Sequence, residues 1–167
     1  MKSFRQEKRA SAFLAFSLTL IFRAVLYWLP LQPVYASDAP FVRIYDWKTG
    51  EIYAEARTQV GSTLFFGWIH SLEKIPWNEY YHIDENYDLI LDEITFPAFG
   101  AGIPEDKGQV CYIKDGLIHM AKIDQVFKEL LWLNSHTATR DIKLDDELLI
   151  SGSELPQHVK LRLVVEN

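Results

Sequence analysis

Between residues 41 and 165, apolar side chains recur at every second position or in short runs, with turn-forming residues between them. This spacing is typical of β-strands and differs from the period of a helix. The clearest turn signal is Asp115-Gly116, which predicts a hairpin. The strands are expected at 41–45, 51–54, 64–70, 77–83, 89–96, 110–114, 117–122, 142–144, 147–150 and 159–165. Such regular spacing predicts a small antiparallel sandwich or barrel.

One later segment has helical spacing instead. Between Ile123 and Leu133, the apolar residues Ile123, Phe127, Leu130 and Leu131 fall on one stripe of a helix. We therefore predict a mainly β fold with at most one short helix.

The N-terminus has a different pattern. Four cations within the first nine residues precede an apolar run from Ala10 to Leu31, whose only charge is Arg23. This run is long enough to span a bilayer, with the flanking cations in the cytoplasm and the rest of the chain outside. Residues 1–36 are therefore predicted to be a signal-anchor, with a single-pass membrane location and an extracytoplasmic β domain over residues 37–167.

Two alternatives to the anchor remain open. Arg23 is costly in a spanning helix, which favours a cleaved signal peptide ending at Val34-Tyr35-Ala36. In that case the domain is secreted or periplasmic. The other alternative is a buried N-terminal helix in a cytosolic protein.

Charge and cysteine content narrow the function further. The chain has 17 Lys and Arg against 23 Asp and Glu, for a net charge of −6. Because the first 36 residues hold five of the cations, the remainder is more acidic still, and a nucleic-acid partner is not expected. The lone Cys111 permits no internal disulfide, so the domain must be stabilised by its core.

The segment from Trp68 to Tyr80 is the first candidate site. If His70 pairs with Trp77 across a hairpin, Trp68 pairs with Glu79, and His70 and Glu79 become diagonal neighbours on an aromatic face. An imidazole and a carboxylate in such a setting should perturb each other's titration, which makes them candidates for function. The alternative is a satisfied buried pair that only stabilises the hairpin.

The segment from Phe96 to Pro104 is the second candidate. Gly100 and Gly102 permit positive φ angles and exposed amide N–H groups, which can form a concave anion site. A tight turn without a ligand is the alternative. The segment lacks the third glycine and the βαβ setting of a dinucleotide site.

Other signatures of chemistry are weak. Asp84, Asn86 and Asp88 have the spacing that opens an EF-hand loop, but Leu89 and Thr95 replace its glycine and final glutamate, so we expect a surface turn. The remaining histidines lack close ligand spacing. We therefore predict no metal site, no cofactor and no catalytic residue.

At the two candidate segments the sequence resembles domain-of-unknown-function family eighteen-fifty. Its members begin with an apolar segment and share an aromatic-x-His-Ser core followed by a basic residue, Pro and Glu, with Phe-x-x-Phe-Gly-Ala-Gly-x-Pro downstream. The resemblance covers roughly residues 55 to 105. The matching positions here are Trp68, His70, Ser71, Lys74, Pro76 and Glu79, then Phe96, Phe99, Gly100, Ala101, Gly102 and Pro104.

The resemblance implies a function by association. Such proteins are often encoded beside tripartite ATP-independent periplasmic (TRAP) transporters, particularly those with TAXI-type solute-binding proteins, which typically carry carboxylates. Residues 37–167 are too few for the two-lobed solute receptor, so an accessory or ligand-handling role, with contacts to transporter subunits, is expected. The pocket for a small carboxylate would then be formed by His70, Ser71, Lys74, Glu79, Gly100, Ala101 and Gly102.

Two other classes of function remain open. The domain could be a structural envelope protein that binds a partner along an exposed edge strand. Alternatively, it could be a small hydrolase or isomerase in which His70 and Glu79 act as acid and base, although an enzyme is the less favoured expectation.

Overall fold

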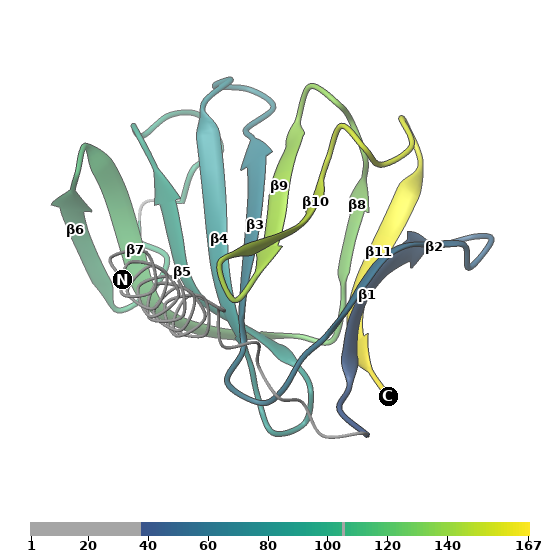
Figure 1. Ribbon diagram of the computed structural model, residues 1–167. Helices are drawn as coiled ribbons and strands as arrows, with labels where there is room; N and C mark the ends of the chain where they lie inside the picture. The colour runs from purple at the N-terminus through teal and green to yellow at the C-terminus, as the bar shows by residue number, and fades with distance from the viewer. Residues whose placement is uncertain (1–37, 105) are drawn as a thin grey trace, which may run out of the picture. The chain divides into compact units, whose positions relative to one another are not determined.

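The computed structural model describes residues 38–104 and 106–167, which form β-strands joined by turns and loops, without a helix (Figure 1). In this part of the chain there is no helix of the length and apolarity needed to cross a membrane. The segment predicted to be an anchor or signal peptide lies outside the described residues. The strands are β1 (Phe41–Asp46), β2 (Ile52–Arg57), β3 (Thr63–Ile69), β4 (Pro76–Ile83), β5 (Leu89–Phe96), β6 (Val110–Lys114), β7 (Leu117–Phe127), β8 (Leu130–Leu133), β9 (Thr139–Leu144), β10 (Glu147–Ser151) and β11 (Lys160–Glu166).

The strands form two antiparallel sheets (Figure 1). The smaller sheet has the order β2-β1-β11-β8, and the larger has the order β10-β9-β3-β4-β5-β7-β6. The predicted hairpins β1–β2 and β6–β7 are both present. The fold is thus mainly β and sandwich-like, as the alternation of the sequence predicts.

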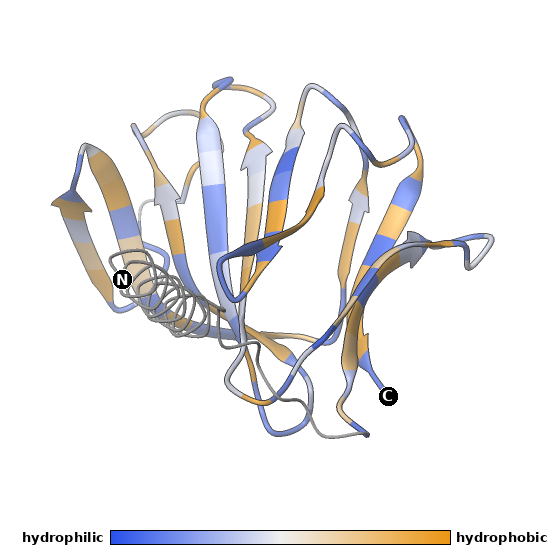
Figure 2. Cartoon of the chain, viewed as in Figure 1, coloured by the Kyte–Doolittle hydropathy of each residue, from blue (hydrophilic) through white to orange (hydrophobic). Residues whose placement is uncertain are grey.

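The core consists of the inward-facing side chains of both sheets. Val42 and Ile44 on β1 and Leu161 and Leu163 on β11 are fully buried and form one cluster with residues of the larger sheet. Figure 2 shows hydrophobic and hydrophilic residues along the same strands. Burying each aliphatic side chain contributes about 1.5 to 3 kcal/mol, so these two central strands hold the small sheet against the large one.

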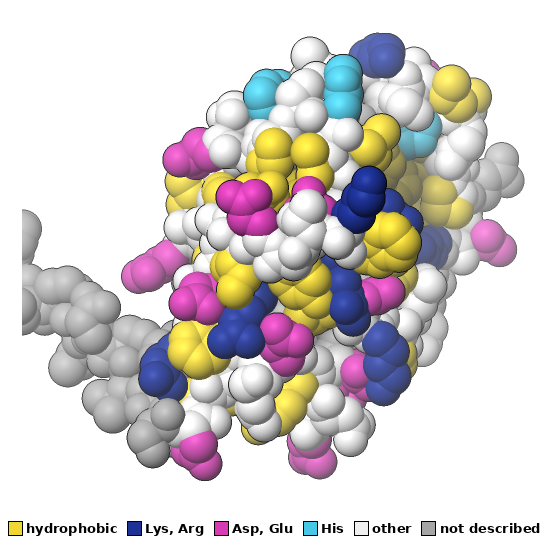
Figure 3. Space-filling model, turned by 90° about the vertical axis from the view of Figure 1, so that its right-hand side faces the viewer, with side chains coloured by type: hydrophobic (Ala, Val, Ile, Leu, Met, Phe, Trp, Pro, Cys, Tyr) yellow, Lys and Arg dark blue, Asp and Glu magenta, His cyan; other side chains and the backbone are white. Residues whose placement is uncertain are grey.

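The outer side of the small sheet carries mixed charge. Figure 3 shows Lys and Arg interspersed with Asp and Glu on this side of the molecule. Arg43 on β1 bonds Glu55 on β2 at 3.0 Å and Glu166 on β11 at 3.1 Å, so one guanidinium bridges three neighbouring strands. Surface pairs of this kind contribute little each, and they keep the exposed face polar.

The register of β3 with β4 differs from the prediction by two residues. Trp68 pairs with Trp77 and Phe66 with Glu79, whereas the predicted register paired His70 with Trp77. The reason is that His70 closes the turn: its N–H donates to the Ile75 carbonyl at 2.8 Å. Because a strand has a period of two, this shift leaves every side chain on its predicted face.

The predicted helix at 123–133 is wrong. Residues up to Phe127 continue β7 along β5, and residues 130–133 form β8 along β11. Lys122 and Asp124 have positive φ angles, beside a register shift between Leu91 and Glu93. This irregularity offsets the alternation of apolar residues, and the resulting spacing imitates a helical stripe.

Asn134 joins the loops at one end of the two sheets. It follows β8, is fully buried, and its Nδ2 donates to the carbonyls of Gly152 at 3.1 Å, Leu155 at 3.3 Å and Pro156 at 3.0 Å. Its backbone N–H also donates to Val159 at 2.9 Å. One side chain therefore contacts three carbonyls of the connection between β10 and β11.

We predict that Asn134→Ala lowers the free energy of unfolding by about 2 kcal/mol or more, because the carbonyls of Gly152, Leu155 and Pro156 lose a donor in a buried or part-buried setting. Urea denaturation of the purified chain measures this. The control is Asn86→Ala, in an exposed turn, which should change stability by less than about 0.5 kcal/mol. Equal effects of the two substitutions would contradict the role assigned to Asn134.

Candidate functional site

A cavity of about 450 Å³ lies between β8 of the small sheet and the inner face of the large sheet. Its wall is mainly apolar and includes five aromatic residues from β3, β4, β7 and β8. Phe66, Trp68, Tyr81, Phe127 and Trp132 are these aromatic residues. Glu79, Lys107 and Glu129 are the charged residues among the described part of the wall. The volume is within the range of small-molecule sites.

Glu79 is held in the wall by three aromatic donors. Its Oε1 accepts hydrogen bonds from Trp68 Nε1 at 3.3 Å and Trp77 Nε1 at 3.0 Å, and its Oε2 accepts one from the Tyr81 hydroxyl at 2.6 Å. Trp77, Glu79 and Tyr81 alternate along β4 and so share a face, while Trp68 lies opposite Trp77. The strand period of β4 and the pairing of β3 with β4 therefore assemble this arrangement.

Burial and the charge of Glu79 change the pKa of Tyr81 in the cavity wall. The pKa of its hydroxyl is raised above its ordinary value, first by burial, then by the nearby charge of Glu79 and by the hydrogen bond to it. Tyr81 therefore remains a proton donor to the carboxylate even in alkaline solution.

His70 and Glu79 lie on either side of the tryptophan pair. The His70 ring is buried and packs against Trp68, with ring centroids 5.7 Å apart, and against Trp77 at 5.8 Å. Its Nδ1 accepts the N–H of Glu73 at 3.4 Å. The prediction that His70 and Glu79 are diagonal neighbours is wrong, because the register places Phe66, and not Trp68, opposite Glu79.

The two motifs meet in space. Glu73 Oε1 accepts the N–H of Ala101 at 2.7 Å. A Cβ atom on Gly100 would lie 2.4 Å from Glu73 Cδ, and one on Gly102 would lie 3.8 Å from His70 Cε1. Gly102 has the expected positive φ, at +81°. The turn after β3 thus packs directly on the glycine loop.

Glu73 is the residue of this contact that the sequence analysis missed. Its carboxylate occupies the Ala101 amide, one of the groups expected to face an anion. The only signal in the sequence is an acidic residue inside the first motif, between Ser71 and Lys74. A hydrogen-bond partner that is far along the chain cannot be inferred from such a position alone.

The candidates divide into two groups in the structure. Glu79 is the one candidate among the described residues that line the cavity. Ser71 and Lys74 are exposed in the turn after β3, and Lys74 has a positive φ of 58°. The glycine loop is likewise exposed from Gly100 to Gly102. These surface residues surround the contact between the motifs and lie apart from the cavity wall.

Most of the cavity wall was outside the predicted site. Phe127 on β7 and Leu130 to Leu133 on β8 all belong to the segment that was predicted to be a helix. Glu129 lines the cavity and forms an ion pair with Arg162 of β11. Lys107 comes from the loop before β6. The residues of β8 reach the cavity because β8 pairs with β11 in the small sheet.

A second titratable cluster lies on the other face of the large sheet. Glu93 contacts His119 and accepts the Tyr112 hydroxyl at 3.2 Å, and the Tyr112 and His119 rings stack 4.7 Å apart. Desolvation, followed by the charge of Glu93, raises the pKa of Tyr112. The contacts link β5, β7 and β6 across the sheet.

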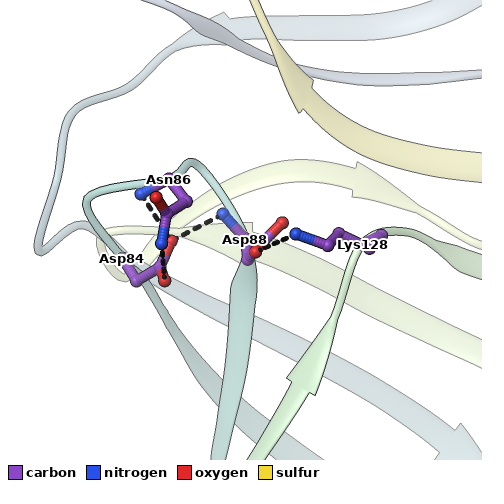
Figure 4. A network of polar contacts seen from close by, with 4 residues as sticks. All are labelled: Asp84, Asn86, Asp88 and Lys128. Atoms are coloured by element: carbon purple, nitrogen blue, oxygen red, sulfur yellow. Dashed lines mark hydrogen bonds and ion pairs between the residues drawn. The ribbon is translucent and has the colours of Figure 1, made fainter.

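The acidic segment after β4 forms a turn, as predicted. Asp84 Oδ1 accepts the N–H groups of Asn86 and Asp88, each at 2.8 Å, and Asp88 bonds Lys128 at 2.5 Å (Figure 4). The acidic oxygens thus bind groups of the chain itself. Among residues 38–104 and 106–167, no group of three or more His, Cys, Asp or Glu side chains could hold a metal ion.

A comparison with family profiles confirms the family that the two segments resemble. The profile of the family described as Domain of unknown function (DUF1850) matches residues 64–149, just over half of the chain. The chain belongs to this family. No curated protein and no solved structure matches it.

The DUF1850 match runs from β3 to β10. It includes both motifs, Glu79 with its donors and all the described residues that line the cavity. Strands β1, β2 and β11 lie outside the match, although β1 and β11 supply the fully buried Val42, Ile44, Leu161 and Leu163 to the core. The matched segment therefore contains the candidate site, and the flanking strands complete the DUF1850 fold around it.

Replacing Tyr81 by Phe tests the support of Glu79. We expect a loss of about 2 kcal/mol of stability at neutral pH, since a hydrogen bond to a charged group is removed. The native pKa of Tyr81 is raised above the ordinary 10.0, so its contribution is complete below about pH 10 and falls as the pH rises beyond that. The difference between wild type and variant, measured by urea unfolding, should narrow above about pH 10.

Tyr80→Phe is the matched control, because Tyr80 is exposed on the other face of β4. It should leave stability within about 0.5 kcal/mol of wild type. A difference in stability between wild type and Tyr81→Phe that stays constant between pH 8 and 11 would contradict the coupling to Glu79.

The contact between the motifs predicts an effect on the glycine loop. Glu73→Gln weakens the bond to the Ala101 N–H, so this amide should exchange with solvent about five- to tenfold faster, with a global loss under about 1 kcal/mol. Hydrogen exchange followed by NMR measures both. Glu85→Gln, in the exposed turn after β4, is the control, and an unchanged Ala101 rate would refute the link.

Proposed function

We propose that this domain is an extracytoplasmic, membrane-tethered ligand-handling protein that is accessory to a solute importer of the TRAP class with a TAXI-type receptor. The observation that carries the ligand-handling part is the cavity, with a hydrogen-bonded carboxylate in an otherwise mainly apolar and aromatic wall. A few placed polar groups in an apolar pocket are typical of small-molecule sites.

The importer part of the proposal has a different basis. It rests on the resemblance of the two motifs, which extends over His70, Ser71, Lys74 and the loop Gly100 to Gly102. In the structure these residues are close together, and all except His70 are exposed. We propose this surface as the contact with a transporter subunit.

An enzyme is less well supported by the geometry. The aromatic pair Trp68 and Trp77 lies between His70 and Glu79, and each of the two has its own hydrogen-bond partners. Acid–base catalysis would require both groups to reach one substrate.

A structural role has one observation in its favour. Strand β6 is at the edge of the large sheet and is exposed along its whole length, with Ile113 76% exposed. An exposed apolar edge can add a strand from a partner. An envelope protein bound along β6 is therefore the second candidate.

Co-expression with the importer tests the proposal. The tagged full-length chain is purified with untagged membrane subunits and receptor, and we expect the membrane subunits to co-elute at a fixed ratio. Leu133→Trp places a large ring at the exposed part of the cavity wall and should lower solute uptake by the complex several-fold. Leu148→Trp, exposed on β10 and outside the cavity wall, is the control.

The results of this experiment distinguish the accessory role from the structural role of β6. No co-elution, with uptake unaffected by Leu133→Trp, would refute the accessory role. Co-elution that is lost on Ile113→Lys and kept in the cavity variant would favour the structural function of the β6 edge instead.

A further inference from the structure

We infer that the cavity takes an organic cation, an alkyl- or arylammonium group on an apolar body, with the ammonium against Glu79. This inference rests on the proposed ligand-handling function and names the ligand class. It also replaces the small carboxylate that the family resemblance implies.

The carboxylate of Glu79 has no cation among its hydrogen-bond partners. Trp68, Trp77 and Tyr81 are neutral donors, and none of the ion pairs among the described residues includes Glu79. A half-buried carboxylate in an apolar wall is costly without an opposite charge nearby. The cavity beside it has room for that charge to arrive with a ligand.

The carboxylate of Glu79 can accept one more hydrogen bond. A carboxylate has about four acceptor positions, two on each oxygen. The tryptophan N–H groups take two on Oε1, and the Tyr81 hydroxyl takes one on Oε2. One position on Oε2 is left, which suits one N–H of an ammonium group.

Aromatic rings line the cavity beside Glu79. Phe66 and Trp132 pack edge to face at 77°, and Tyr81 and Phe127 at 83°, so rings in different orientations surround the space. Aromatic faces attract ammonium cations, most strongly where water is excluded. The leucines of β8 and Leu91 supply the contact for an apolar body.

The other charges of the wall do not favour an anion at Glu79. Glu129 is already paired with Arg162. Lys107 is a half-buried side chain of a loop, and its long stem lets the ammonium turn toward water when a cation is bound. A carboxylate ligand in contact with Glu79 would instead meet a like charge.

The test compares three probes of similar shape that differ in charge. The full-length chain in phosphatidylglycerol nanodiscs, whose lipid carries no ammonium, is titrated by calorimetry and tryptophan fluorescence. The probes are 2-phenylethylammonium, the neutral 2-phenylethanol and the anion 3-phenylpropanoate. We expect the cation to bind at least tenfold more tightly than the other two.

Glu79→Gln should remove that preference and leave 2-phenylethanol binding within about twofold of wild type. Glu129→Gln changes the other acid of the wall and should preserve the preference. If Glu79→Gln fails to fold, as judged by its melting curve, Leu133→Trp serves instead and should weaken all three probes.

Tightest binding of 3-phenylpropanoate, lost on Lys107→Met, would overturn the inference in favour of a carboxylate. Equal binding of the three probes would also overturn it. Either result, obtained while the importer subunits still co-elute and the cavity variant still lowers uptake, would leave the proposed function intact.

Discussion

The hydrogen bonds that Glu79 accepts from Trp68, Trp77 and Tyr81 organise the inner face of the large sheet. A charged group in an apolar interior must be surrounded by donors, and here β3 and β4 supply them from positions that the strand period places on one face. The bulky donors stand around the carboxylate and give the wall its aromatic character. The small sheet then covers this face through β8, and the remaining space is the cavity.

The contact between the two family motifs has a simpler physical basis. The turn after β3 begins with His70, whose ring packs on the tryptophans, and continues to Glu73, whose carboxylate accepts the Ala101 N–H. Gly100 leaves room for that carboxylate, since a Cβ atom would overlap it. These contacts give a packing reason for His70, Gly100 and Gly102 without assigning chemistry to the loop.

The sequence predicts the strands well because alternation and turn residues are local signals. Asp115-Gly116 marks its hairpin correctly, and residues 89–96 are predicted to the residue. The register of β3 and β4 was wrong by two because a period of two cannot distinguish registers that differ by two. The prediction of a helix at 123–133 was wrong because the register shift between Leu91 and Glu93 displaced the alternation of apolar residues in β7. The cavity depends on β8 pairing with β11, which no local pattern contains.

The pairing of β1 with β11 brings together opposite ends of the described domain, and Arg43 and Glu166 in these strands are 123 positions apart. Val42, Ile44, Leu161 and Leu163 can be buried only after both ends are present. During synthesis, the earlier strands must therefore wait with an uncovered apolar face until the last one has emerged. A chaperone that holds the chain unfolded over this interval would protect it from aggregation, so the time at which the chain is released becomes part of how the domain folds.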